Sequence, residues 1–147
     1  MNTLADFAAQ EPLGYLLHRT ALAMRRELSR AFKARGYAIT PDQLIVLGSL
    51  WRSDGQTQKE LADGTFKDMP NITRILDGLQ RRKLLVRREH EGDRRSFRVF
   101  TTPEGMALMQ KLVPVLDEVN RKASTGLTPR EIARFKELLK KIYGNVS

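Results

Sequence analysis

The sequence contains no cysteine among its 147 residues, and it has only two histidines and an aromatic content of 7%. The absence of cysteine excludes disulfides, thiol chemistry and thiolate metal ligands. His18 and His90 are isolated from each other and from clustered carboxylates, so we expect no metal site, because metal ligands normally occur in groups. The glycines are scattered and form no phosphate-binding loop. We therefore expect neither an enzyme nor a bound cofactor.

Long apolar runs are also missing. No stretch approaches the roughly 20 apolar residues that a membrane-spanning helix needs. Residues 1–7 lack the positive segment and apolar stretch that mark a secretory signal. We therefore expect a cytoplasmic protein without membrane contact. With 147 residues, 41% of them hydrophobic, the chain is long enough for one domain with a real core.

Basic residues are in excess, and the formal net charge is +9. The excess is concentrated in residues 19–35, with six basic residues to one acidic, and in residues 69–102, with nine to four. Clustered positive charge suits phosphate binding. Because the two clusters carry equal net charge, charge alone does not locate a nucleic-acid-binding face.

Apolar residues at helical spacing, together with capping residues and helix-ending glycines, predict a series of helices. We expect them over about 13–35, 41–52, 58–63, 69–82, 103–124 and 129–143. Capping boxes that begin at Thr40 and Thr57 mark two of the helix starts. In the helix after Thr40, the residues expected on the buried face are Leu44, Leu47, Gly48 and Trp51.

The helix predicted over 69–82 has one apolar stripe, which we expect in the core, and polar residues on its other faces. The stripe consists of Ile72, Ile75, Leu76 and Leu79. The basic run 81–83 at its end either matches the helix dipole or contacts DNA.

Two strands are predicted after this helix, over Leu84–His90 and Ser96–Thr101, and the turn between them, 91–95, should project. A helix for the major groove beside a basic hairpin for the minor groove is the layout of a winged helix-turn-helix. We therefore predict a mainly α fold with a small β-wing, and double-stranded DNA as the partner.

The first and last long helices have apolar stripes but no core of their own. We assign residues 40–102 to a DNA-binding lobe, and residues 13–35 and 103–143 to dimerisation helices, within a single domain over 1–147. Packing against the same helices of a second chain would cover the stripes. A two-fold homodimer would also place two recognition helices about 34 Å apart, as a pseudo-palindromic operator requires.

Four short segments, 57–62, 71–79, 93–95 and 101–105, occur in a defined order and spacing. In that arrangement they resemble the MarR family of bacterial transcription regulators, and the resemblance covers most of the chain. It implies a dimeric, sequence-specific DNA-binding regulator, most often a repressor. The chain departs from the family at Lys83, because the family commonly has lysine followed by glycine and Leu84 follows here. We expect a different bend at the start of the wing.

The resemblance also implies roles for individual residues. The helix from about Met69 would enter the major groove, and the wing would place an arginine in the minor groove. Arg95 is the expected minor-groove residue, beside Arg94, with Asp93 holding its guanidinium. Taken alone, residues 93–95 would more often be a solvated turn, but their position after a recognition-like helix favours DNA contact. The residues expected to contact the major groove are Pro70, Asn71, Thr73 and Arg74, and weaker candidates for phosphate contacts are Lys59, Arg87, Arg88 and Arg98.

Members of this family often bind small aromatic acids between the dimer helices and the DNA-binding lobe. By resemblance, Arg19 would pair with the carboxylate of such an effector, while Tyr15, Leu47 and Trp51 would flank its ring. His18 lies on the same helix as Tyr15 and Arg19. The alternative for these three residues is dimer packing or plain surface.

The leading hypothesis is thus a repressor that leaves its operator when a ligand changes the spacing of the two recognition helices. Without cysteine, the thiol-oxidation switch of some family members is excluded. One alternative is an architectural protein that coats DNA without sequence preference, although the capped recognition helix argues against it. A further alternative is an enzyme or small-molecule carrier with a decayed DNA-binding domain.

Overall fold

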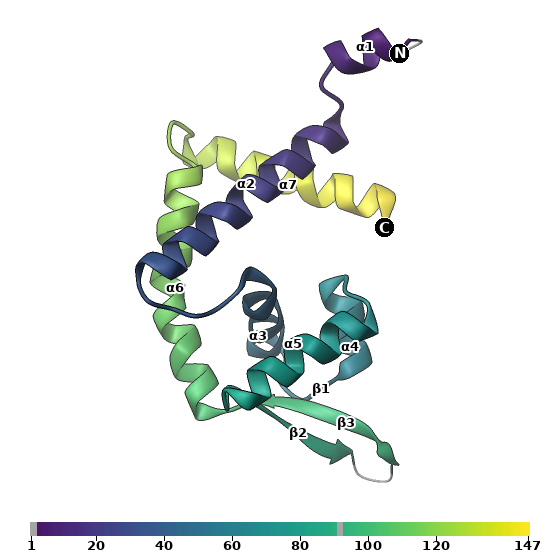
Figure 1. The fold of residues 1–147 in the computed structure, drawn as a ribbon. Coiled ribbons are helices and arrows are strands. Elements are labelled where there is room, and N and C mark those ends of the chain that lie inside the picture. Colours follow the sequence, from purple (N-terminus) through teal and green to yellow (C-terminus); the bar gives the residue numbers. More distant parts are fainter. Residues whose placement is uncertain (1–2, 91–92) are drawn as a thin grey trace.

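The computed structural model describes residues 3–90 and 93–147, without the side chains of Phe7, Ala8, His90 and residues 93–96. The helices are α1 (Leu4–Ala9), α2 (Leu13–Ala34), α3 (Pro41–Arg52), α4 (Gln58–Thr65), α5 (Met69–Arg81), α6 (Pro103–Ala123) and α7 (Pro129–Val146). The strands are β1 (Gln56–Thr57), β2 (Leu85–His90) and β3 (Asp93–Thr101). Figure 1 shows α3, α4, α5 and the sheet gathered beside the long helices α2 and α6. The predicted mainly α fold with a small β-wing is confirmed.

Capping residues set the helix starts as the sequence predicts. The hydroxyl of Thr40 accepts a hydrogen bond from the amide of Gln43, whose side chain accepts one from the amide of Thr40. Thr57 and Glu60 form the same reciprocal pair at the start of α4. These bonds satisfy amides that the first helical turn leaves without backbone partners. Among the helices of the described ranges, none is both long and apolar enough to cross a membrane.

The sheet has three antiparallel strands in the order β1-β3-β2. The sequence did not predict β1, which consists of two residues and pairs Gln56 with Val99. The predicted start of the last strand was also wrong: β3 begins at Asp93 instead of Ser96, so 93–95 belong to the strand and not to a long turn. Pairing with β2 extends the strand through a charged segment that lacks the apolar alternation on which strand prediction depends.

One hydrophobic cluster joins the lobe of residues 40–102 to the long helices α2 and α6. The apolar stripe of α5 lies within it, as predicted, and each of its four residues is at most 5% exposed. Phe32 is the contribution of α2, while α6 supplies Met109, Leu112 and Val115. The lobe therefore rests directly on the helices that flank it in the sequence.

The buried face predicted for α3 needs one correction. Leu44 and Leu47 are buried as expected, but Trp51 is 45% exposed, and Val46 and Leu50 are buried in addition. The physical reason is that α3 packs against α4, α5, α6 and β3 at once. Several neighbours cover more of the helix than one apolar stripe would indicate, and Trp51, in the last turn, lies beyond the covered part.

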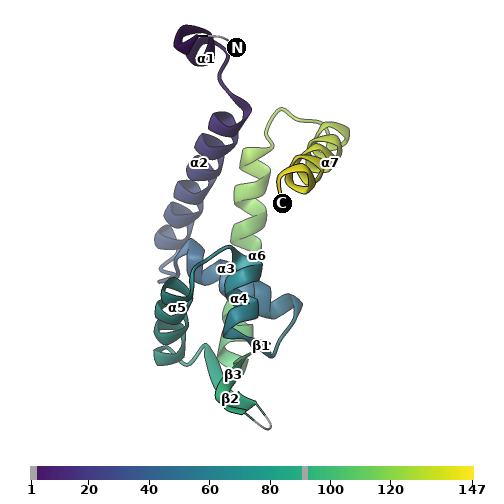
Figure 2. The same cartoon turned by 90° about the vertical axis from the view of Figure 1, so that its right-hand side faces the viewer.

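Helices α2 and α6 run beside each other, and α7 stands off to one side (Figure 2). Ion pairs join the first two: Lys122 lies 2.6 Å from Glu27, and Arg35 pairs with Glu118. Of the described side chains, only Phe32 is buried in α2 and none is buried in α7. These helices therefore keep most of their apolar residues uncovered within the single chain.

Helix α5 ends in a Schellman motif in which Lys83 adopts the left-handed conformation, with φ of 59°. The Lys83 amide donates to the Gln80 carbonyl over 2.9 Å, and the Leu84 amide donates to the Leu79 carbonyl over 3.0 Å. Leu79 and Leu84 are both buried in the core. The bend into the wing is thus made by a lysine, at a position where glycine would carry no steric cost.

We predict that Lys83→Gly raises the free energy of unfolding by about 0.5–1 kcal/mol, since relief of left-handed strain outweighs the added freedom of the unfolded chain. Thermal unfolding at one fixed protein concentration would measure the change. Lys83→Ala is the control, because it removes the same side chain but keeps the strain. An equal gain in both variants would contradict the conformational explanation.

Candidate nucleic-acid interface

The exposed polar face of α5 is determined by the burial of its opposite, apolar face. Its apolar stripe is buried, so Asn71, Thr73 and Arg74 on the other faces are exposed. Asp68 caps the helix by accepting a hydrogen bond from the Asn71 amide over 2.8 Å. Pro70, which lacks an amide hydrogen, fits the first turn, where amides have no partner within the helix. The start of α5 is therefore capped and presents polar side chains to solvent.

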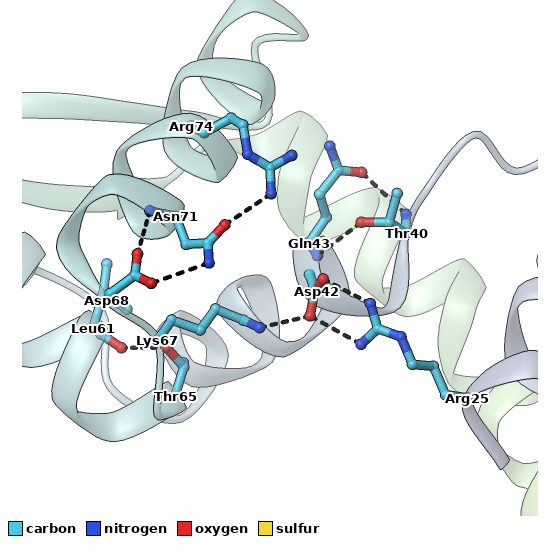
Figure 3. Close-up of polar contacts among 10 residues, drawn as sticks. All are labelled: Arg25, Thr40, Asp42, Gln43, Leu61, Thr65, Lys67, Asp68, Asn71 and Arg74. Atoms are coloured by element: carbon cyan, nitrogen blue, oxygen red, sulfur yellow. Dashed lines mark hydrogen bonds and ion pairs between the residues drawn. The ribbon is translucent and has the colours of Figure 1, made fainter. Parts of the chain in front are cut away.

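Hydrogen bonds order these exposed side chains relative to one another (Figure 3). Arg74 donates to the side-chain oxygen of Asn71 over 2.9 Å, and the Asn71 amide group lies 3.4 Å from Asp68. Because the Asn71 oxygen accepts from Arg74, the two side chains are oriented toward each other without a ligand. An arginine and an asparagine held in this way can each offer hydrogen-bond donors to base edges or phosphates.

Gln58 is part of this surface, although sequence reasoning missed it. Its side-chain nitrogen donates to the hydroxyl of Thr73, which itself donates to the Met69 carbonyl over 2.9 Å. Gln58 is the first residue of α4, so it connects the two helices of the helix-turn-helix. In the sequence, Gln58 is distinguished only by its position between Thr57 and Glu60, the two residues of the capping box. The capping box gives Thr57 and Glu60 a role but predicts none for Gln58.

The guanidinium of Arg87, which was predicted to contact a phosphate, is bound by side chains of α5. Its guanidinium donates to Asp77 over 2.8 Å and to Gln80 over 2.9 Å, and its side chain is 18% exposed. Asp77 and Gln80 belong to α5, whereas Arg87 belongs to β2. The arginine therefore ties the wing to the recognition helix.

The other candidates for phosphate contacts also have defined surroundings. Arg88 lies over the ring of Phe100, 5.2 Å from its centroid. Arg98 donates to the carbonyl of Gly55 over 2.8 Å. Lys59 is exposed on the first turn of α4. Of the three, Lys59 has the geometry that best suits a phosphate at the lobe surface.

The backbone of Asp93, Arg94 and Arg95 lies in β3, near the tip of the wing. Their side chains lie outside the described residues. The proposed ion pair between Asp93 and Arg95 therefore stays a prediction from the sequence.

A cluster of charged side chains lies behind the start of α5. The Asp42 carboxylate accepts two hydrogen bonds from Arg25, over 3.0 and 2.7 Å, and a third from Lys67 over 2.6 Å. The bonds from Arg25, and beyond it from Lys67, hold the pKa of the Asp42 carboxyl well below its ordinary value, although partial burial acts in the opposite direction. Asp42 is therefore ionised at neutral pH and pairs with both cations.

A cavity of about 360 Å³ lies between α2, α3 and α6, with Arg25 in its wall. The walls are mainly apolar, and the residues that line it include His18, Leu22, Leu28, Leu44, Ile45 and Leu116. His18 and Arg25 are seven residues apart on α2 and share one face of it. That spacing could have identified Arg25 from the sequence as a second polar residue of this site.

The structure does not bring together the five residues predicted for effector binding. His18 lines the cavity, whereas Arg19 pairs with Glu11 and lies over the ring of Tyr15, outside the lining. Leu47 is fully buried in the core, and Trp51 is exposed at the end of α3. The cavity of this chain therefore depends on α2 residues further along than those predicted, together with α3 and α6.

Comparison with known proteins points to one family. A sequence model of the MarR family matches residues 39–96, from just before α3 into β3. The HTH-type transcriptional repressor Mb2911 of Mycobacterium bovis is 29% identical over 139 residues, which cover 95% of this chain and 96% of the repressor.

Two solved structures extend the likeness to three dimensions. A mutant of E. coli MarR complexed with operator DNA has a TM-score of 0.83 and 28% identity, with 92% of this chain and 96% of that chain covered. BpsR of Bordetella bronchiseptica, whose DNA binding is regulated by 6-hydroxynicotinic acid, has a TM-score of 0.81 and 26% identity, with 89% and 98% covered.

Helix α5 follows α4 after a short turn, exposes a polar face and lies beside a three-stranded wing. This arrangement defines a winged helix-turn-helix DNA-binding protein. The chain matches the MarR family of transcription regulators in the sequence of residues 39–96 and, by comparison with E. coli MarR, in the fold of 92% of its length. The resemblance seen in the sequence is confirmed. The protein is accordingly a DNA-binding transcription regulator and not an enzyme.

We predict that Arg87 and Asp77 stabilise the fold as a pair. A double-mutant cycle with Arg87→Met and Asp77→Asn should give a coupling energy of about 0.5–1 kcal/mol in chemical unfolding. The matched cycle on Arg134 and Glu137, an exposed pair on α7, should give no measurable coupling. Absence of coupling at Arg87, together with weaker DNA binding by Arg87→Met, would favour a phosphate contact instead.

Proposed function

We propose that the protein is a dimeric repressor that binds a pseudo-palindromic operator and leaves it when a small aromatic acid binds. The observation that carries the proposal is the exposed, hydrogen-bonded polar face of α5, above a stripe that is buried. Two relatives support it: the M. bovis protein is a transcriptional repressor, and E. coli MarR was solved on operator DNA.

The proposed contacts divide between two grooves. Residues of α5 enter the major groove, where base edges are distinguishable, and Gln58 supports them through Thr73. Arg95 enters the minor groove, with Asp93 and Arg94 beside it. Lys59 binds a phosphate. The proposed major-groove residues are Pro70, Asn71, Thr73 and Arg74.

Dimerisation is proposed because α2 and α7 leave apolar side chains uncovered. Phe135 is 52% exposed and Tyr15 is 54% exposed, and the described part of α7 buries no residue. Residues 13–35 and 103–143 would pack on their copies in the second chain and leave 40–102 as the DNA-binding lobe. Two-fold symmetry would then place two copies of α5 about one turn of duplex apart, roughly 34 Å.

The cavity beside Arg25 is the proposed effector site. Its apolar walls suit an aromatic ring, and the N–H donors of the Arg25 guanidinium that do not bind Asp42 suit a carboxylate. BpsR, which shares the fold, is regulated by 6-hydroxynicotinic acid, an aromatic acid of suitable size. A ligand that favours one spacing of the two lobes would shift the population away from the DNA-binding conformation.

Selection of duplexes from a random pool tests sequence-specific binding. The wild-type protein should enrich a pseudo-palindrome and prefer it over random duplex by about 10³-fold at physiological salt. Arg74→Ala should weaken binding to that site by about 1–3 kcal/mol. Lys140→Ala, a change at an exposed residue of α7, should leave the affinity unchanged. Equal affinity for selected and random duplexes would instead support an architectural protein.

Effector release is tested by adding 6-hydroxynicotinic acid to the protein on its selected duplex. The acid should weaken DNA binding by about fivefold or more. Ala21→Phe should fill the cavity that Ala21 lines, and so remove the response while the affinity for DNA is kept. Acetate, which has the carboxylate but no ring, is the matched control. A response that persists in Ala21→Phe would place the effector elsewhere.

A further inference from the structure

The charged cluster behind α5 connects three parts of the fold (Figure 3). Arg25 lies on α2, Asp42 lies in the first turn of α3, and Lys67 lies in the turn between α4 and α5. Asp42 accepts hydrogen bonds from both cations, over distances of 2.6 to 3.0 Å. A single carboxylate therefore joins a long helix of the flanking pair to the segment that starts the recognition helix.

Lys67 is placed to transmit this connection to α5. Its side chain is 17% exposed, and its backbone amide donates to the Ala62 carbonyl over 3.0 Å. The next residue, Asp68, caps α5 through Asn71, and Asn71 accepts a hydrogen bond from Arg74. An unbroken series of short contacts thus runs from Arg25 to the exposed polar face of α5.

The surroundings of Lys67 differ from those of a phosphate-binding lysine. A lysine that binds DNA phosphates is typically solvated in the free protein, whereas the ammonium of Lys67 is drawn inward by Asp42. The Arg25 guanidinium is bound to the same carboxylate in two-point geometry, which restricts the rotation of the carboxylate. Asp42 therefore has a fixed orientation in which to hold Lys67.

We infer that Asp42 is a positioning residue for DNA binding, which holds the start of the recognition helix in register with α2 through Lys67 and Arg25. The inference rests on the proposed role of α5 in the major groove, and it adds residues that do not themselves touch DNA. Loss of the carboxylate frees the turn at Lys67, so the polar face of α5 becomes less ordered and its fit to a base sequence is weakened.

The chain offers a matched control in Glu27. Its side chain is 26% exposed, as is that of Asp42, and it also pairs with two cations, Lys122 over 2.6 Å and Arg30 over 3.1 Å. Those pairs join α2 to α6 and stay within α2, away from α5. Glu27→Gln therefore removes an equivalent charge without a connection to the recognition helix.

The test compares Asp42→Asn, Lys67→Met and Glu27→Gln on the duplex that the wild-type protein selects, at a temperature where each variant is folded. Asp42→Asn and Lys67→Met should each weaken binding by roughly 2- to 30-fold, and the double variant should be no weaker than either one. Asp42→Glu should recover part of the loss. Glu27→Gln should leave the affinity unchanged.

Salt dependence separates positioning from direct contact. If Lys67 only positions α5, the slope of log affinity against log salt is the same in Lys67→Met as in the wild type. A slope reduced by about 0.9, with unchanged or tighter binding by Asp42→Asn, would assign Lys67 to a phosphate and overturn the inference.

Amide hydrogen exchange gives a readout that does not need DNA. Exchange at Asn71 and Ile72, whose amides are bonded to Asp68, should be several-fold faster in Asp42→Asn and unchanged in Glu27→Gln. Unchanged exchange and unchanged affinity in Asp42→Asn would overturn the inference alone. Failure of the wild-type protein to select any duplex would overturn the proposed function, and the inference with it.

Discussion

Burial of the α5 stripe is the constraint on which the rest of the structure depends. The stripe packs into the common core, and its burial determines which side chains the helix presents to solvent. Its residues are Ile72, Ile75, Leu76 and Leu79. A rotation of α5 about its axis would expose about four large apolar side chains, each worth roughly 1.5–3 kcal/mol when buried. The exposed polar face is therefore a consequence of core packing. Its residues can be substituted without a change in how the helix packs.

Burial of the stripe does not determine how the two ends of α5 are positioned against neighbouring segments. Hydrogen bonds and ion pairs of polar side chains do this at both ends. At the start, Asp68 caps the helix, and Asp42 holds the preceding turn through Lys67. At the far side, Arg87 joins β2 to α5. These bonds are directional, whereas hydrophobic burial is not, so they determine the angle and spacing of helix and wing once the core has determined the face.

The long helices show the opposite balance. Their apolar residues exceed what one chain can cover, and α7 buries none of its described side chains. Such surface is costly in water, and a second copy of the same helices would cover it by symmetry. Two of the long helices, α2 and α6, line the cavity beside Arg25 together with α3, so a ligand there and the spacing of two lobes would depend on one set of contacts. Within this arrangement, Asp42 joins α2 to the turn that precedes the recognition helix.

The sequence by itself determined the order of helices α2 to α7, the capping boxes and the buried stripe of α5, because these depend on residues a few positions apart, but it did not predict α1. It also identified the family and the polar residues of the recognition helix. It placed Trp51 in the core, set the start of β3 at Ser96 and missed β1, because burial and strand pairing depend on neighbours distant in the chain. Only the tertiary structure decided that Arg87 faces α5 and that Asp42 lies between Arg25 and Lys67. Residues 25, 42 and 67 are brought together by packing, and no local pattern records a contact over such separations.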